Sequence, residues 1–242
     1  MTFLRTEALT KRFGGLTAVR AVTFAVEAGE LVGIIGPNGA GKTTLFNLLT
    51  GFLRPDQGRS VLRDAPIAGL APHRIVDRGL ARTFQIARPF ADMTVLENVA
   101  TACVCPRARR MSGGLGASER ALAVLAAVGM DGKAAFPVHT LPFGDLRRVE
   151  IARAMATQPE VLLLDEPFAG LGPTEIAPLA SLIRALSAQG VTMLIVEHKL
   201  RELMRLVTRV IVMHFGEIIA QGAPEAVARE PRVVEAYLGG AM

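Results

Sequence analysis

The stretch ELVGIIGPNGAGKTT, residues 30–44, decides the fold. Residues 30–35 are almost entirely apolar, which is typical of a strand buried on both faces. Residues 36–43 then match the phosphate-binding pattern GxxxxGK[ST] without a mismatch, and the sequence that follows predicts a helix over 42–49. A buried strand, a glycine-rich turn and a helix in this order predict a phosphate-binding loop (P-loop) in an α/β sheet.

Each part of this loop has a physical role in holding a nucleoside triphosphate. The glycines let backbone N–H groups close around phosphate oxygens, and the helix N-terminus adds its own unpaired donors. Lys42 supplies a positive charge to the β- and γ-phosphates, and the hydroxyl of Thr43 is placed to bind Mg²⁺. A dinucleotide-binding loop is excluded, because the glycines do not form GxGxxG. The loop residues expected to bind the triphosphate are Gly36, Pro37, Asn38, Gly39, Ala40, Gly41, Lys42, Thr43 and Thr44.

A second apolar strand ends in a pair of acids. Residues 161–164 are Val-Leu-Leu-Leu, and they lead directly into Asp165 and Glu166. Such a strand carries both acids to the carboxyl edge of the sheet, where open α/β folds bind their ligands. We expect Asp165 to hold Mg²⁺ through a water molecule, and Glu166 to polarise the water that attacks the γ-phosphate. The loop and the acid pair together predict an enzyme that hydrolyses a nucleoside triphosphate, and either element alone fits many such enzymes.

The rest of the chain predicts a core that is split by a helical segment. Strands are expected at 3–9, 22–26, 161–164 and 191–196, and helices at 94–104, 118–128, 145–157 and 173–188. The strand–helix–strand order near the end predicts a mostly parallel sheet. Residues 55–72 mix proline, glycine and short apolar runs, which is typical of turns around small strands.

We therefore expect an α/β P-loop NTPase core of the RecA-like kind, with a small antiparallel β lobe and a helical subdomain. Residues 1–85 and 159–242 would form the core and the β lobe, and residues 86–158 the helical subdomain. Residues 107–116, rich in arginine and glycine, are expected to form an exposed loop.

Composition excludes several classes of protein. The chain has 242 residues, and 27 basic against 22 acidic residues give a net charge of +5, which is too small to argue for nucleic acid binding. No apolar run approaches the roughly 20 residues that span a bilayer. The first residues lack the apolar core of a signal peptide, so a cytosolic protein is expected. The two cysteines, Cys103 and Cys105, are expected to be reduced thiols.

Four further segments resemble the ABC-transporter ATPases, and the resemblance covers nearly the whole chain. Residues 82–85 are Arg-Thr-Phe-Gln, residues 141–148 are LPFGDLRR before a helix, His198 follows an apolar strand, and Phe13 precedes the phosphate loop. The resemblance implies that Gln85 completes the metal shell and senses a membrane partner, that His198 is a switch residue, and that Phe13 stacks on adenine. It also implies a signature stretch that caps the γ-phosphate of ATP bound to a second subunit, through Phe143, Gly144 and Asp145.

Three positions depart from the broad pattern of that family. Pro142 stands where the signature has serine, Asp145 where it has glutamine, and Gly172 where an inter-subunit aspartate is usual. These changes are expected to weaken the ATP sandwich between two subunits. Residues 111–116, MSGGLG, look more like the signature than 141–148 do, but they lie too far before Asp165 and precede no basic helix.

One subgroup matches best, the ATPases of branched-chain and hydrophobic amino-acid importers. Its likeness lies in KRFGGLTAV at 11–19, RTFQ at 82–85, RRVEIAR at 147–153 and EAYLG at 235–239. The resemblance implies a homodimer or a heterodimer with a second ABC ATPase, permease subunits, an indirectly acting periplasmic binding protein, and a peripheral place on the cytoplasmic face of the inner membrane. The ATPase of lipopolysaccharide export, and a soluble ABC ATPase of DNA repair or translation, remain as alternatives. Residues 84–90 are expected to line the groove that receives a permease helix.

Overall fold

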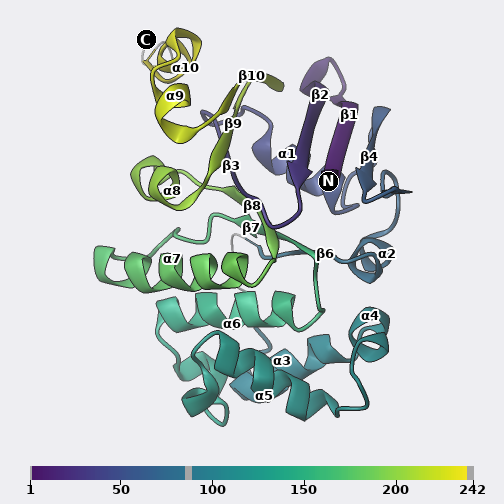
Figure 1. The fold of residues 1–242 in the computed structure, drawn as a ribbon, viewed down its shortest axis with the longest axis vertical. Helices are drawn as coiled ribbons and strands as arrows, with labels where there is room; N and C mark the ends of the chain where they lie inside the picture. The colour runs from purple at the N-terminus through teal and green to yellow at the C-terminus, as the bar shows by residue number, and fades with distance from the viewer. Residues whose placement is uncertain (1, 85–88, 239–242) are drawn as a thin grey trace.

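The structure is a computed structural model that describes residues 2–84 and 89–238. Its central sheet has six strands in the order β10-β9-β3-β8-β7-β6 (Figure 1). The pairs from β9 through β6 are parallel, and only β10 is antiparallel to its neighbour. The strands are β3 (Leu31–Ile35), β6 (Leu80–Arg82), β7 (Val161–Asp165), β8 (Thr192–Val196), β9 (Arg209–His214) and β10 (Glu217–Gly222).

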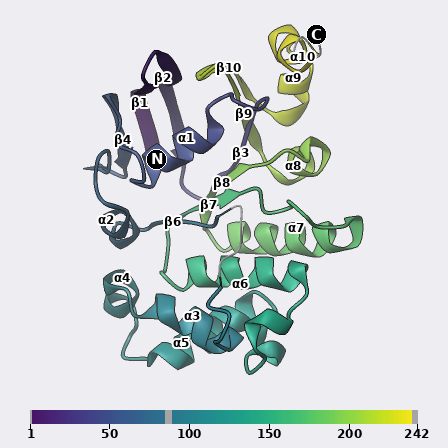
Figure 2. The ribbon, with the colours of Figure 1, turned by 180° about the vertical axis from the view of Figure 1, so that it is seen from behind.

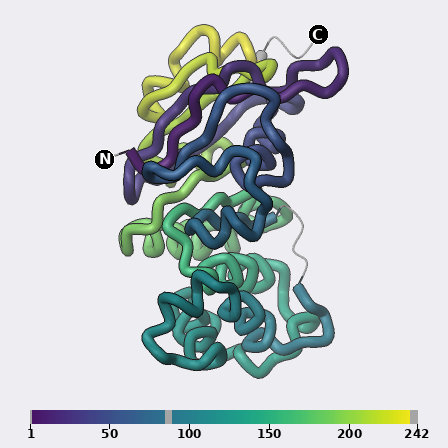
Figure 3. Tube along the Cα trace, turned by 90° about the vertical axis from the view of Figure 1, so that its right-hand side faces the viewer, coloured from purple at the N-terminus to yellow at the C-terminus, as the bar shows by residue number. Residues whose placement is uncertain are grey.

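A smaller antiparallel sheet in the order β2-β1-β4-β5 forms a β lobe beside the central sheet (Figure 3). Helix α1 (Lys42–Leu49) buries its apolar side chains in one cluster with residues of both sheets. This packing fixes the phosphate loop between the lobe and the core. The strands of the lobe are β1 (Thr2–Phe13), β2 (Leu16–Glu27), β4 (Gln57–Leu62) and β5 (Ala65–Pro66).

Helices cover the rest of the core and form a separate layer below it. Helix α7 (Pro173–Ala188) lies between the central sheet and a lower group made of α3, α4, α5 and α6 (Figures 1 and 2). Within that group α3 contacts both α5 and α6. The lower helices are α3 (Val95–Cys103), α4 (Pro106–Arg110), α5 (Ala117–Ala127) and α6 (Phe143–Met155). The others are α2 (Pro72–Asp77), α8 (Leu200–Leu206), α9 (Pro224–Ala228) and α10 (Pro231–Leu238), with two short 3₁₀ turns at Asp131–Lys133 and Val138–Thr140.

The expected α/β fold with a mostly parallel sheet and an antiparallel β lobe is confirmed. The predicted strands and helices are all present, although β1 and β2 are longer than expected and α6 begins at Phe143 rather than at 145. No helix among the described residues is long and apolar enough to cross a membrane.

The prediction of an exposed loop over 107–116 was wrong in its first part. Residues 106–110 form helix α4, in which Pro106 occupies the first turn and the Cys105 sulfur accepts the N–H of Ala108. Arg107 is only 9% exposed, and its guanidinium bonds Glu160 at 2.6 Å and the carbonyl of Gln158 at 2.7 Å. This pairing with residues distant in sequence orders a basic segment that looks solvated by composition alone.

Candidate active site

The parallel strands bring the candidate residues to one edge of the central sheet. Strands β3, β6, β7 and β8 run in the same direction, so the segments after them share the carboxyl edge. The register pairs Asp165 with Val196, which places Glu166 and Glu197 one step beyond neighbouring strand ends. Four segments far apart in the sequence therefore meet at the same place.

The phosphate loop follows β3 and has a backbone that requires glycine at two places. Gly36 has φ 153°, and a Cβ there would lie 2.1 Å from the carbonyl oxygen of Met213. Gly41 has φ 99°, and a Cβ there would lie 2.3 Å from the carbonyl oxygen of Ala18. The loop is thus held closely between β2 and β9, and its tip at Asn38 and Gly39 is exposed.

Lys42 begins α1 and turns back across the loop. Its Nζ donates to the carbonyl oxygens of Gly36 at 2.7 Å and Pro37 at 3.1 Å. Burial lowers the pKa of Lys42, while the carboxylates of Glu166 and Asp165 act in the opposite direction. The ammonium group therefore lies inside the loop and interacts electrostatically with the two acids at the end of β7. The next residue, Thr43, is exposed.

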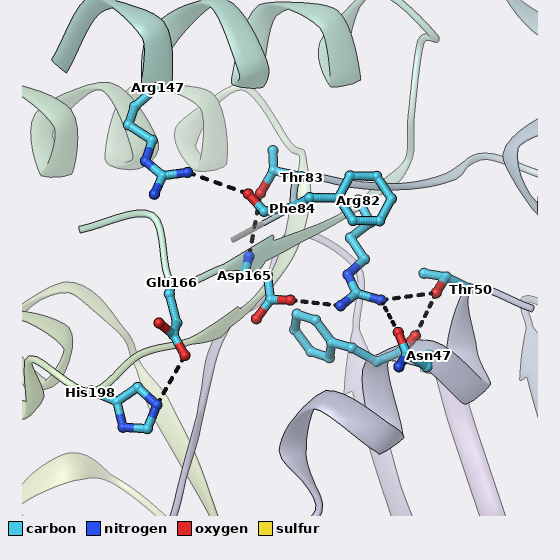
Figure 4. Close-up of polar contacts among 10 residues, drawn as sticks. Asn47, Thr50, Arg82, Thr83, Phe84, Arg147, Asp165, Glu166 and His198 are labelled. Carbon is cyan, nitrogen blue, oxygen red and sulfur yellow. Dashed lines mark hydrogen bonds and ion pairs between the residues drawn. The ribbon is translucent and has the colours of Figure 1, made fainter. Parts of the chain in front are cut away.

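Asp165 is nearly buried, and its carboxylate forms an ion pair that the sequence did not predict. Nη2 of Arg82 lies 2.6 Å from Oδ2 of Asp165, and the two side chains are 5% and 6% exposed (Figure 4). The backbone N–H of Asp165 donates to Oγ1 of Thr83 at 3.3 Å. Residues 82–83, just before the expected Gln85, thus hold the end of β7 from the neighbouring strand.

Glu166 occupies an uncommon backbone conformation at the same edge. Its φ is 49°, in the left-handed region that non-glycine residues rarely adopt, and its N–H donates to the carbonyl of Val196 at 2.8 Å. His198 Nε2 lies 3.0 Å from Oε1 of Glu166 (Figure 4). The structure therefore brings together the two residues predicted as catalytic base and switch histidine.

Glu197 is a second residue that sequence reasoning missed. It is 2% exposed, and its carboxylate accepts backbone N–H groups from Phe168 at 2.6 Å, His198 at 2.9 Å and Lys199 at 3.1 Å. These bonds join the segment after Glu166 to the segment that carries His198. The available signal was an acid directly after the apolar strand 191–196, the same pattern that identified Asp165.

The stretch that the sequence predicts as the signature begins α6. Pro142 is the N-cap residue and makes no side-chain capping bond, while its carbonyl accepts the N–H of Asp145 at 3.0 Å. The N-terminal turn faces the N-terminus of α7, because a Cβ on Gly144 would lie 2.9 Å from a carboxylate oxygen of Glu175. Phe143 is 42% exposed, and Asp145 pairs with Lys133. The resembling stretch 111–116 instead forms turns between α4 and α5.

The two remaining predicted site residues are Phe13 and Gln85. Phe13 ends β1, is 46% exposed, and lies 5.7 Å from Nζ of Lys11. Its strand pairs with β2, which passes the phosphate loop at Ala18. Gln85 lies outside the described residues.

A groove of about 760 Å³ opens beside the acid pair, between the core and α6. Burial raises the pKa of Glu150, although a hydrogen bond from Arg147 acts against it, and burial lowers the pKa of Arg153. The guanidinium of Arg153 also stacks 4.9 Å above the ring of Phe90. The groove is lined by Thr43, Arg82, Phe84 and Asp165 on the core side and by Glu150 and Arg153 on α6.

Comparisons with known proteins agree with this geometry. A family model described as "ABC transporter" matches residues 19–169, and one described as "Branched-chain amino acid ATP-binding cassette transporter" matches residues 217–242. The chain is 42% identical to the high-affinity branched-chain amino acid transport ATP-binding protein LivG of Escherichia coli K12, over 98% of both chains. It is 36% identical to the lipopolysaccharide export system ATP-binding protein LptB of Acidithiobacillus ferridurans, over 98% of this chain and 96% of the relative.

Among solved structures, the ADP conformation of MJ1267, an ATP-binding cassette of an ABC transporter, superposes with a TM-score of 0.89 and 34% identity over 99% of both chains. The phosphate loop, the acid pair and His198 meet at one sheet edge, and the "ABC transporter" model covers more than half of the sequence. The chain belongs to the ATP-binding cassette ATPases of ABC transporters.

Proposed function

We propose that this ATPase powers the uptake of branched-chain or related hydrophobic amino acids. One observation carries the proposal: the C-terminal segment 217–242 matches a model specific to branched-chain amino acid cassettes, in a chain that is 42% identical to LivG over 98% of its length. The similarity to LptB is lower at 36%, which ranks lipopolysaccharide export second. ATP hydrolysis is common to both.

The residues at the sheet edge fit Mg²⁺ and ATP. Thr43 and Asp165 offer a hydroxyl and a carboxylate, the hard oxygen donors that Mg²⁺ prefers, and both line the groove. Residues 2–84 and 89–238 contain no cluster of three or more His, Cys, Asp or Glu that would hold a metal. That suits an ion bound by few protein groups together with phosphate oxygens. When bound, Mg²⁺ neutralises charge on the β- and γ-phosphates.

The chain's own groups then divide the work. The loop amides and Lys42 orient the phosphates, and Phe13 stacks on adenine. Glu166 accepts the proton of the attacking water. His198, whose Nε2 is 3.0 Å from Oε1 of Glu166, orients that carboxylate. Gln85 completes the metal shell in this proposal. The N-terminal turn of α6, with the exposed Phe143 and the half-buried Gly144 and Asp145, caps the γ-phosphate bound to a partner ATPase.

The proposed assembly has two ATPase chains, as a homodimer or a heterodimer, docked on permease subunits at the cytoplasmic face of the membrane. A periplasmic binding protein would deliver the amino acid to the permeases. Residues 86–158 would rotate as a helical subdomain against the core. The end of the groove formed by Phe84 and α6, away from Thr43 and Asp165, is the proposed seat for a permease helix, because the groove links α6 to the catalytic edge.

Growth and uptake measurements test the amino-acid assignment. Deletion of the gene is expected to abolish high-affinity uptake of radiolabelled leucine, isoleucine and valine. Wild-type protein should restore uptake, while the Glu166→Gln variant should not. Unchanged amino-acid uptake, together with loss of lipopolysaccharide from the cell surface, would reject the importer in favour of the export alternative.

The docking groove yields a prediction at Phe90, which is 47% exposed and stacks against Arg153. Phe90→Asp should abolish the stimulation of ATPase activity by permeases in proteoliposomes and leave ATP affinity unchanged, because the side chain lies outside the phosphate loop. Leu122→Asp, at an exposed position of α5, is the matched control. Full stimulation of the Phe90 variant would place the docking surface elsewhere.

The signature yields a prediction at Pro142, which offers neither a hydroxyl nor an N–H to phosphate. A hydroxyl contact to a charged oxygen is worth about 1.5–3 kcal/mol at most. Pro142→Ser in a Glu166→Gln background should therefore tighten ATP-driven dimerisation by about tenfold, measured by sedimentation velocity. Pro142→Ala, which removes the ring without adding a hydroxyl, should show no gain. Equal or weaker dimerisation of the serine variant would mean that proline shapes the start of α6.

A further inference from the structure

Arg82 joins two elements of the candidate metal site that are far apart in the sequence. Nη2 donates to Oδ2 of Asp165 at 2.6 Å, at the end of β7. Nη1 donates to Oδ1 of Asn47 at 2.6 Å and to Oγ1 of Thr50 at 3.4 Å, at the end of α1 (Figure 4). One planar guanidinium therefore bridges the helix that begins at the phosphate loop and the strand that ends in the acid pair.

The bridge is shielded from water. The guanidinium carbon lies 5.5 Å from the ring centre of Phe46 and 5.3 Å from that of Phe84. The side chains of Arg82 and Asp165 are 5% and 6% exposed. A charge-assisted hydrogen bond in such a place is short and directional, so it fixes the position of both partners.

The geometry has a direct consequence for metal binding. Thr43 and Asn47 are one helical turn apart on α1, so fixing Asn47 also fixes Thr43. The Oδ2 atom of Asp165 is occupied by Arg82, and the described residues supply no hydrogen bond to its Oδ1 atom. That leaves the Oδ1 atom of Asp165 for a ligand, and both Asp165 and Thr43 line the groove.

We propose that Arg82 is a positioning residue for the magnesium site. Its two-armed guanidinium holds α1 and β7 at a fixed separation, so that Thr43 and Asp165 would serve the same Mg²⁺, and it commits Oδ2 of Asp165, so that Oδ1 would be the oxygen left to hold the ion directly or through water. This inference rests on the proposed role of Asp165 in binding Mg²⁺. The proposed positioning role differs from a pure charge effect, in which the positive charge of Arg82 would only weaken metal binding.

We call the contacts of Arg82 with Asp165, Asn47 and Thr50 the clamp. Metal titration of the ATP-bound protein tests whether the clamp positions the magnesium site. The measurement is Mn²⁺ binding by electron paramagnetic resonance, in a Glu166→Gln background that prevents turnover. Arg82→Lys keeps the charge but has a single nitrogen that does not span both partners. Asn47→Ala removes the 2.6 Å bond of the α1 arm and leaves only the 3.4 Å contact with Thr50, while the ion pair with Asp165 stays. Both should raise the Mn²⁺ concentration at half-saturation by about tenfold or more. Arg74→Lys, at an exposed arginine, is the control and should change nothing.

The outcomes separate this inference from the function on which it rests. Parental Mn²⁺ affinity in both clamp variants, with weakened binding in Asp165→Asn, would overturn the clamp and leave the metal site in place. Unchanged Mn²⁺ binding in Asp165→Asn would overturn both. Tighter binding in Arg82→Met would show that Arg82 acts by charge repulsion, which also overturns the clamp. If thermal melting shows that the Arg82 variants do not fold, Asn47→Ala decides the question.

Discussion

Replacement of Glu166 by glutamine should slow ATP turnover by at least about a hundredfold while preserving ATP binding, because loss of a general base costs on this scale. The other acids at this edge are committed elsewhere: Asp165 pairs with Arg82, and Glu197 accepts three backbone N–H groups. Neither is placed to substitute for Glu166. Phosphate release under saturating ATP measures the change.

The same variant should accumulate as an ATP-bound dimer, since binding is retained and hydrolysis no longer separates the subunits. Sedimentation with ATP, compared with ADP, detects this species. Glu217→Gln is the control, because Glu217 is an exposed acid whose pairing with Arg20 is a surface contact at 3.4 Å. Near-normal phosphate release by the Glu166 variant would remove this residue from the mechanism.

The parts of the site that are contiguous in sequence could be predicted from it. The phosphate loop places its ligands within residues 36–44, and the acid pair directly follows its strand, so pattern and chemistry coincide. His198 required knowledge of a family, because a lone histidine after a strand carries little signal by itself.

The missed residues act through contacts between distant segments. Arg82 meets Asp165, Glu197 meets Phe168, and Arg107 meets Glu160, and in each case a charged group is satisfied by a partner on another element. Composition treats such side chains as solvated. The strand order, which sets β6 beside β7 and β7 beside β8, brings the first two pairs together, and the position of α4 brings Arg107 to Glu160. The helix at 106–110 was missed for the same reason.

Replacement of Glu197 is the second change for which we expect a large effect. Its buried carboxylate holds both the segment after Glu166 and the segment that carries His198. Oε1 accepts the N–H of Phe168, two residues beyond Glu166, and Oε2 accepts the N–H groups of His198 and Lys199. Acceptance of several backbone N–H groups requires both oxygens. Glutamine has nearly the same shape but presents one oxygen and one NH₂ group. The NH₂ group would therefore face a backbone N–H group, and neither could accept a hydrogen bond from the other.

Glu197→Gln should therefore lower the free energy of unfolding by about 3 kcal/mol, the scale of losing charge-assisted bonds to buried donors. For a chain of this length that corresponds to a fall in Tm of roughly 6–12 °C. Turnover should fall as well, because the backbone on either side of the Glu166–His198 contact loses its common anchor. Calorimetry and phosphate release measure the two effects, with Glu235→Gln, an exposed acid on α10, as control. A variant as stable and as active as the parent would show that the loops hold this geometry without the carboxylate, and that the strand ends alone align base and histidine.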